Sequence, residues 1–201
     1  MKNQLKNALA LSCVAMATTS AIAQDRPRVN LNQPQQVQAP GITYTYAGVR
    51  YINQSIDGSG IDCDQDGLNL FGSLDLKEGF FAKASYSDVS GNHGCGSSSF
   101  SAGAGYHTAY SDTVDMYATL SFVSVSEGDN DSGLEFAGGM RTFLTEVVEG
   151  SVELYHGTYG LEETGIRGTV DYWLNESWTV NGGVALGSDS TTFGLGARYA
   201  F

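Results

Sequence analysis

The last ten residues of the chain alternate in character with a period of two. The apolar members all share one parity: Phe193, Leu195, Ala197, Tyr199 and Phe201. A helix would scatter these side chains around its circumference, whereas a β-strand places all of them on one face. Arg198 falls in the opposite parity, among small and polar neighbours. The pattern therefore predicts a strand with one oily face and one polar face.

The same alternation runs back through the chain as far as Gly41. The segments that carry it are 42–52, 68–76, 80–86, 100–106, 114–126, 134–143, 148–159, 164–174, 178–186 and 192–201. The first is the least regular, because Tyr44 and Tyr46 share a parity with Arg50, so we expect a bulge or a mixed face there. The pattern predicts an all-β protein: a closed, antiparallel, up-and-down transmembrane β-barrel of about ten strands, with eight as the alternative.

Two sets of links should join these strands. Short turns are expected near 75–79, 111–113, 145–146 and 175–177, on the periplasmic side if the first strand starts there. Outer loops are expected around 57–66, 88–97, 127–132, 157–162 and 187–190. The outer loops are short for a transporter or a receptor.

The distribution of charge favours a membrane barrel over a soluble one. Acidic and basic residues fall almost entirely in the polar parity, and the apolar parity is nearly free of them. A Lys or Arg on the lipid face would cost about 2–4 kcal/mol at the bilayer midplane. Aromatic residues also gather near the strand ends, as the interfacial belts of membrane barrels require. A closed barrel leaves no unpaired backbone edge in the hydrocarbon.

The first residues have the anatomy of an export signal. Lys2 and Lys6 precede an apolar run over 8–17, and Ala21-Ile22-Ala23 offers small residues for cleavage. The run is shorter than the roughly 20 residues that span a bilayer. We expect a signal peptide at 1–23, a flexible periplasmic leader at 24–40 that is rich in Gln, Asn and Pro, and the outer-membrane barrel at 41–201.

The chain is acidic, with a formal net charge of −12. Contacts with nucleic-acid phosphates require a basic face, so a nucleic-acid partner is excluded. The expected partners are outer-membrane lipid and lipopolysaccharide.

Residues 41–201 resemble the small bacterial outer-membrane β-barrel proteins of the OmpA/OmpX type. Three stretches carry the resemblance: Gly-Ile-Thr-Tyr-Thr-Tyr at 41–46, Gly-Ala-Gly-Tyr-His at 103–107 and Phe-Gly-Leu-Gly-Ala-Arg-Tyr-Ala-Phe at 193–201. The resemblance implies that Ala197, Tyr199 and Phe201 form the signal read by the barrel-assembly machinery. About ten strands would exceed the eight of the smallest members.

Cys63 and Cys95 form an even pair once the signal peptide is removed. They lie in or beside outer loops that flank the same pair of strands, and an exported chain enters an oxidising compartment. We expect a disulfide, which would add roughly 3 kcal/mol.

Asp62, Asp64 and Asp66 match the first half of an EF-hand calcium loop. The twelfth position of that loop is Ser73, where a bidentate Glu is needed, so the motif is not an EF-hand. These carboxylates remain weak candidates for Ca²⁺ or Mg²⁺. The alternative is a solvated acidic loop.

The polar parity places both signs of charge in the lumen. We expect ion pairs between the bases Arg50, Lys83, Arg141, Arg167 and Arg198 and the acids Asp75, Asp115, Glu135, Glu149, Glu153 and Asp171. Side chains can fill so narrow an interior, and buried charges need partners. A plug of ion pairs is the expectation, and a narrow pore through them is the alternative.

Catalysis is not expected. The sequence has neither Gly-x-Ser-x-Gly nor His-Glu-x-x-His. His156 with Glu153, Glu162 and Glu163 is the remote alternative of an outer-membrane hydrolase, while His93 and His107 lie at different depths. We expect no cofactor. The expected function is that of a non-enzymatic outer-membrane barrel in envelope integrity or surface interaction, and the alternative is a channel for ions or small solutes.

Overall fold

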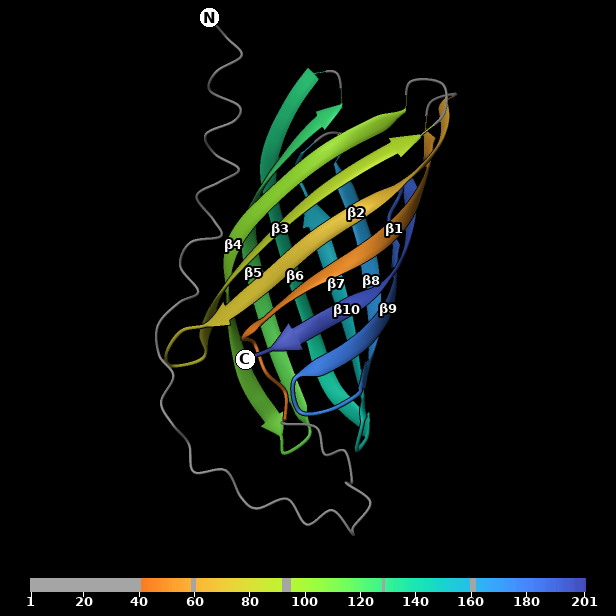
Figure 1. Ribbon diagram of the computed structural model, residues 1–201. Coiled ribbons are helices and arrows are strands. Elements are labelled where there is room, and N and C mark those ends of the chain that lie inside the picture. Colours follow the sequence, from red (N-terminus) through yellow and green to blue (C-terminus); the bar gives the residue numbers. More distant parts are fainter. Residues whose placement is uncertain (1–40, 59–60, 92–94, 128, 160–161) are drawn as a thin grey trace, which may run out of the picture. The chain divides into compact units, whose positions relative to one another are not determined.

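The described residues form one closed sheet of ten antiparallel strands. The computed structural model describes residues 41–58, 61–91, 95–127, 129–159 and 162–201. The strands are β1 (Tyr46–Gly58), β2 (Ile61–Asp75), β3 (Phe80–Gly91), β4 (Gly96–Ser111), β5 (Val114–Glu127), β6 (Asp129–Thr145), β7 (Val148–Gly157), β8 (Glu163–Trp173), β9 (Trp178–Leu186) and β10 (Ser190–Ala200). Each strand pairs with its neighbours in sequence, and β1 also pairs with β10 (Figure 1). The predicted up-and-down barrel is confirmed, with ten strands rather than eight.

The predicted signal peptide at 1–23 and leader at 24–40 lie outside the described residues. Within the described ranges, no helix is long and apolar enough to cross a membrane.

The strands extend into segments that were predicted as outer loops. Asp57 pairs with Asp62 across the β1–β2 hairpin, and Glu127 pairs with Asp129 across the β5–β6 hairpin. The predicted loops at 57–66 and 127–132 were therefore too long. The prediction required alternating hydrophobicity, whereas strand pairing requires only backbone hydrogen bonds and continues where both faces are polar.

The first strand differs from its prediction in two ways. It begins at Tyr46 instead of residue 42, and its pairing with β2 and β10 contains no bulge. The register is irregular elsewhere, at Ala109/Ser111 and at Phe143/Thr145. Tyr46 and Arg50 share a parity because both line the barrel interior, so the mixed face is a lumen face that contains an aromatic ring.

The links at the end of the barrel where β10 finishes are tight. The Phe80 N–H donates to the Lys77 carbonyl at 3.1 Å, and the central residues Glu78 and Gly79 have φ values of 60° and 82°. Two positive φ values define a type I′ turn, which suits the twist of a two-strand hairpin. The Asn175 Oδ1 accepts from the Ser177 and Trp178 N–H groups at 2.9 Å each. We refer to this end as the short-turn end.

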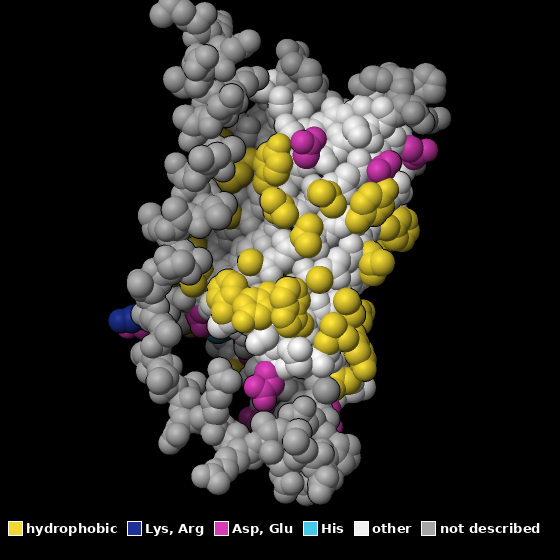
Figure 2. Space-filling model, in the orientation of Figure 1, with side chains coloured by type: hydrophobic (Ala, Val, Ile, Leu, Met, Phe, Trp, Pro, Cys, Tyr) yellow, Lys and Arg dark blue, Asp and Glu magenta, His cyan; other side chains and the backbone are white. Residues whose placement is uncertain are grey.

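The outside of the barrel is apolar around its middle. Leu154 and Leu195 are 65% and 70% exposed, and every strand presents similar side chains outward. Figure 2 shows apolar side chains across the middle of the visible face and acidic ones toward its two ends. Near the short-turn end, Phe80 packs on Tyr106 and Trp178 on Tyr199, with ring centroids 5.2 and 4.9 Å apart. An oily band with aromatic residues at its edge suits contact with lipid.

Candidate functional site: the barrel lumen

The inward-facing parity of the strands lines a lumen with two distinct layers. A densely packed layer, here called the floor, lies toward the short-turn end and is formed by Tyr44, Arg141, Glu149, Asp171, Trp173 and Arg198. A polar cavity of about 490 Å³ extends from the floor toward the outer hairpins, and Tyr44, Arg141, Asp171 and Arg198 of the floor also line it. The two layers are described in turn.

Glu149 is the centre of the floor. Its side chain is 1% exposed. Oε1 accepts from Nε of Arg141 at 2.8 Å and also from Nη2 of the same guanidinium. Oε2 accepts from Nη2 of Arg198 at 3.0 Å and from the Trp173 indole N–H at 3.3 Å. This carboxylate is buried with all of its accepting capacity used, as a stable buried charge requires.

The floor links adjacent strands across the lumen. The Arg198 Nε lies 3.5 Å from Oδ1 of Asp171, which also accepts from the Thr179 hydroxyl at 3.2 Å. Arg141, Glu149, Asp171, Thr179 and Arg198 belong to β6, β7, β8, β9 and β10. One network therefore joins half of the strands.

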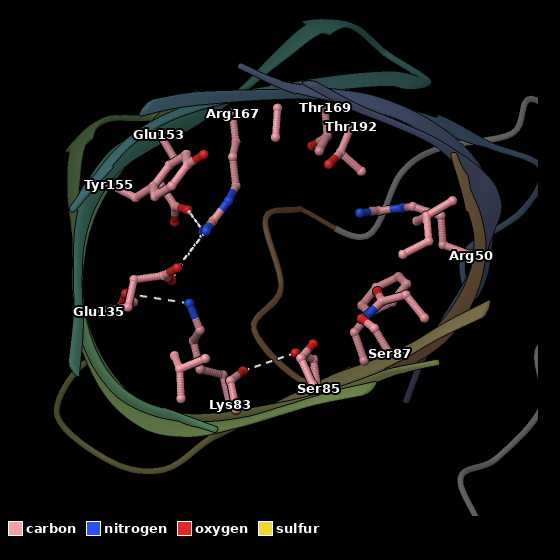
Figure 3. Close-up of a pocket in the computed structure, with 18 of the residues that line it drawn as sticks. Arg50, Lys83, Ser85, Ser87, Glu135, Glu153, Tyr155, Arg167, Thr169 and Thr192 are labelled. Atoms are coloured by element: carbon pink, nitrogen blue, oxygen red, sulfur yellow. Dashed lines mark hydrogen bonds and ion pairs between the residues drawn. The ribbon is translucent and has the colours of Figure 1, made fainter. Parts of the chain in front are cut away.

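The segment just before β1 enters the lumen and completes the floor. Tyr44 is 3% exposed, and its ring stacks on His107 with centroids 4.0 Å apart. The guanidinium of Arg141 makes a cation–π contact with Tyr44, 4.7 Å from the ring centroid. Its Nη1 donates to the Thr43 carbonyl at 2.8 Å. In Figure 3 the ribbon of this segment runs inside the ring of strands. Residues 43 and 44 thus act as part of the plug.

Asp75 and Asp115 face a histidine instead of the predicted basic partners. The His107 Nδ1 lies 3.3 Å from Asp115, and its Nε2 lies 3.6 Å from Asp75. Asp75 is at the end of β2 and is largely exposed. Neither carboxylate pairs with an Arg or Lys of the described residues, because the bases of this layer are engaged by Glu149 and Asp171.

One wall of the cavity carries a second ion cluster. Nη1 of Arg167 donates to Glu135 at 3.1 Å and to Glu153 at 2.7 Å, and Nη2 also bonds to Glu135. The guanidinium lies 3.8 Å from the Tyr155 ring centroid. These residues lie together in Figure 3. The side chain of Arg167 is 32% exposed, so this cluster is wetter than the floor.

A tyrosine from the β7–β8 link joins this cluster. The Tyr159 hydroxyl donates to Glu135 at 3.1 Å. Burial, together with the nearby Glu135 charge, raises the pKa of Tyr159, so the hydroxyl stays neutral and remains a donor.

Two of the five bases that were expected to form ion pairs in the lumen have no such pair with a described carboxylate. Among the described residues, neither Arg50 nor Lys83 has a carboxylate within ion-pair distance. The Arg50 Nε donates to the Asn181 amide oxygen at 3.0 Å, and its guanidinium lies 4.7 Å from the Phe71 ring centroid. The Lys83 Nζ donates to the Thr119 hydroxyl at 3.4 Å. The prediction for these two bases was wrong, because the groups that they contact directly are an amide, a hydroxyl and a ring.

The predicted disulfide between Cys63 and Cys95 is confirmed, with the two Cα atoms 5.9 Å apart. Cys63 is buried at the inward parity of β2, together with Gln65. The disulfide therefore ties the start of β4 to β2 at the outer mouth of the barrel.

Asp64 and Asp66, two of the three candidate cation ligands, lie on the outward face of β2. Asp64 and Asp66 are exposed, and the Tyr51 hydroxyl donates to Asp66 at 2.8 Å. The side chain of Asp62 lies outside the described side chains. In the described part of the chain, no three His, Cys, Asp or Glu side chains are grouped so that they could hold a metal ion.

The remote hydrolase hypothesis placed Glu153 near His156, which was wrong. His156 is exposed and its Nδ1 lies 2.8 Å from the Thr164 hydroxyl. Glu153 lies three residues before His156, at the inward parity, where it pairs with Arg167. The wall of the barrel separates the two groups. His93 lies outside the described residues.

The C-terminal residues Tyr199 and Phe201 are exposed on the outer face, with ring centroids 5.7 Å apart. Ala197 shares their parity and pairs with Val49 of β1. The structure therefore presents this row of side chains away from the lumen.

Sequence reasoning missed the aromatic part of the lumen. The rings of Phe71, Tyr155 and Trp173 lie against guanidinium groups, whereas the predicted lumen set contained only charged residues. Parity was the signal that could have found them, because Trp173 shares the parity of Asp171, and Phe71 shares the parity of Asn69.

No family model and no curated protein matches the chain. Solved structures that resemble it in fold include the following two. One is the KdgM porin in complex with disordered oligogalacturonate, with a TM-score of 0.50, 12% identity, and coverage of 78% of this chain and 99% of that one. The other is the β domain of the Bordetella autotransporter BrkA, with a TM-score of 0.50, 12% identity, and coverage of 79% and 100%. At this identity the likeness shows the fold alone, which is that of an outer-membrane β-barrel.

Proposed function

We propose that this chain, given its outer-membrane barrel fold, is a non-enzymatic protein of the bacterial outer membrane whose lumen is closed. It contributes to envelope integrity or to interactions at the cell surface. The single observation that carries the proposal is the floor, where Glu149, Arg141 and Arg198 meet across the lumen and Tyr44 packs against them. Such a network is costly to open, because each charge would lose its partner in a buried position.

The proposal includes the partners of the barrel. Its outer band contacts membrane lipid, and its upper rim contacts lipopolysaccharide. The signal at 1–23 directs export, and the barrel-assembly machinery reads Ala197, Tyr199 and Phe201. The apolar exterior and the outward placement of these residues support this part. No enzymatic activity and no cofactor are included.

Conductance across a planar lipid bilayer tests the closed lumen. The purified wild-type protein is expected to give no steady openings. The variant Tyr44→Ala removes a ring from the floor without altering a strand, and it is expected to give openings. Tyr110→Ala is the matched control, because Tyr110 is 76% exposed, and it should behave like the wild type. Steady openings of the wild-type protein would contradict the proposal.

A narrow pore is the second candidate function. Arg50 and Lys83 favour it, because neither has a described carboxylate within ion-pair distance, and such cations in a lumen attract anions. KdgM, which has a similar fold, is a porin. Anion-selective openings of the wild-type protein, with the selectivity lowered in Arg50→Gln, would support the pore and exclude the closed lumen.

A further inference from the structure

Arg50 is placed in the cavity with most of its donors free. A guanidinium has five N–H donors. Only Nε is used, in the bond to Asn181, and neither Nη1 nor Nη2 donates to another described residue. Figure 3 shows the Arg50 side chain pointing into the open part of the cavity, on the opposite side from Arg167 and Glu153. The free edge of this guanidinium is the edge that binds a carboxylate or a phosphate in bidentate fashion.

The position of Arg50 is fixed before any ligand arrives. The Asn181 oxygen holds Nε from one side, and the Phe71 ring lies under the guanidinium at 4.7 Å. Arginine stacks on aromatic faces while keeping its fork of donors available. A group held in this way loses little conformational entropy on binding, which favours affinity.

Several hydroxyl groups line the cavity on the side where Arg50 lies in Figure 3. Ser85, Ser87, Thr169 and Thr192 line the cavity there, as Figure 3 shows. The Ser85 and Ser101 hydroxyls are 2.9 Å apart, and Ser87 accepts from the Asn69 amide at 2.8 Å. Each of these hydroxyls can both donate and accept. A ligand with several hydroxyl groups would therefore find partners next to the cation.

The distribution of charge on the Arg167 and Arg50 sides of the cavity also favours an anion at Arg50. On the Arg167 side, two carboxylates share one guanidinium, with Lys83 nearby. On the Arg50 side, Asp171 and Arg198 also line the cavity and act on the guanidinium, but Asp171 is not within ion-pair distance of Arg50 and is itself paired with Arg198. A cation removed from bulk water without a directly paired counter-charge is stabilised by an anion. An anion is thus attracted to Arg50 and repelled by Glu135 and Glu153.

We propose that the cavity binds a small hydroxylated anion of monosaccharide size, with its carboxylate or phosphate held by Arg50 and its hydroxyls by the surrounding Ser and Thr side chains. The volume of about 490 Å³ lies within the range of small-molecule sites. The ligand enters from the outer mouth, next to the Cys63–Cys95 disulfide. Arg50 itself is not part of the floor, so anion binding at Arg50 is tested separately from conductance.

Calorimetric titration of the full-length mature protein in detergent tests the site. The probes are glucuronate and glucose 6-phosphate, with glucose as the neutral match for both. We expect one or both anions to bind at least tenfold more tightly than glucose. If only one anion binds, the anionic group that Arg50 recognises is identified as carboxylate or phosphate.

The variants locate the bound anion. Arg50→Gln is expected to lower the affinity at least tenfold, to the level of glucose, and Lys83→Gln to lower it by a smaller factor. Lys77→Gln removes one positive charge from an exposed turn and should leave the affinity unchanged. Circular dichroism and the mobility of unheated protein on gels report whether each variant folds.

Three results would overturn the proposal. The first is that neither anion binds at concentrations up to about 20 mM. The second is that glucose binds as tightly as the anions, and the third is that folded Arg50→Gln binds them with wild-type affinity. If Arg50→Gln does not fold, competition by rising chloride in the wild-type protein replaces it, and an affinity independent of chloride would contradict the role of Arg50. Conductance is measured separately, so failure of the site and failure of the closed lumen are distinguishable.

Discussion

The floor and the cavity are both lined by inward-facing residues of the strands. Their charged side chains differ in whether an opposite charge is paired with them. In the floor, Glu149 is surrounded by two guanidinium groups and an indole, and nothing polar is left free on it. In the cavity, only Nε of Arg50 donates to a described residue, and Lys83 bonds to one described hydroxyl. The contrast shows that a charged residue in a barrel interior can close the lumen or serve a ligand, depending on whether its neighbours include an opposite charge.

Breaking the floor should give the largest effect. Glu149→Gln leaves Arg141 and Arg198 buried without their shared counter-charge, and loss of one partner from a buried ion cluster costs about 3–5 kcal/mol. We expect the free energy of unfolding in lipid vesicles, measured by urea titration, to fall by this amount. Glu146→Gln, at an exposed turn position, is the matched control and should show no change. A Glu149→Gln variant as stable as the control would mean that the floor does not hold the barrel together.

The ion cluster on the cavity wall should be less sensitive. Glu135→Gln removes one of the two carboxylates that hold Arg167, while Glu153 remains in place at 2.7 Å. Arg167 is also partly hydrated, so the loss should be about 1.5–3 kcal/mol, that of a hydrogen bond to a charged group. The same urea titration measures it. A loss equal to that of Glu149→Gln would remove the distinction between a dry floor and a wet wall.

The smallest effect is expected at Lys83. Its Nζ makes one long hydrogen bond to Thr119 and no ion pair with a described residue. We expect Lys83→Gln to change the free energy of unfolding by less than about 0.5 kcal/mol, as for a substitution away from a network. Thermal unfolding in detergent gives the ranking against Glu135→Gln. A large destabilisation would show that Lys83 belongs to the Arg167 cluster.

Most of the architecture could be predicted from parity alone. A period of two assigns each residue to the inner or the outer face, so the ten strands, the oily exterior and the inward placement of Glu149 and Arg141 could all be read from the sequence. The Cys63–Cys95 disulfide followed from the order of the links. Strand ends were predicted less well, because polar hairpins such as Asp57–Asp62 pair without any change in hydrophobicity.

The partners of the lumen residues could not be predicted, for a geometric reason. Parity gives the face of a residue, but its height in the barrel depends on how the strands are staggered around the axis. Asp75 and Asp115 therefore reach His107, and Arg50 reaches Asn181, with no sequence pattern that distinguishes these contacts from the expected ion pairs. Tyr44 was read as part of a strand, whereas the segment before β1 enters the lumen.

The seam between β1 and β10 has a consequence for biogenesis. Tyr46 pairs with Ala200 and Ile56 with Ser190, so the barrel is closed only by contact between its first and last strands. A chain that lacked β10 would keep two open edges, and unpaired backbone is costly in hydrocarbon. Loss of the last strand should therefore prevent the other nine from forming a stable membrane barrel.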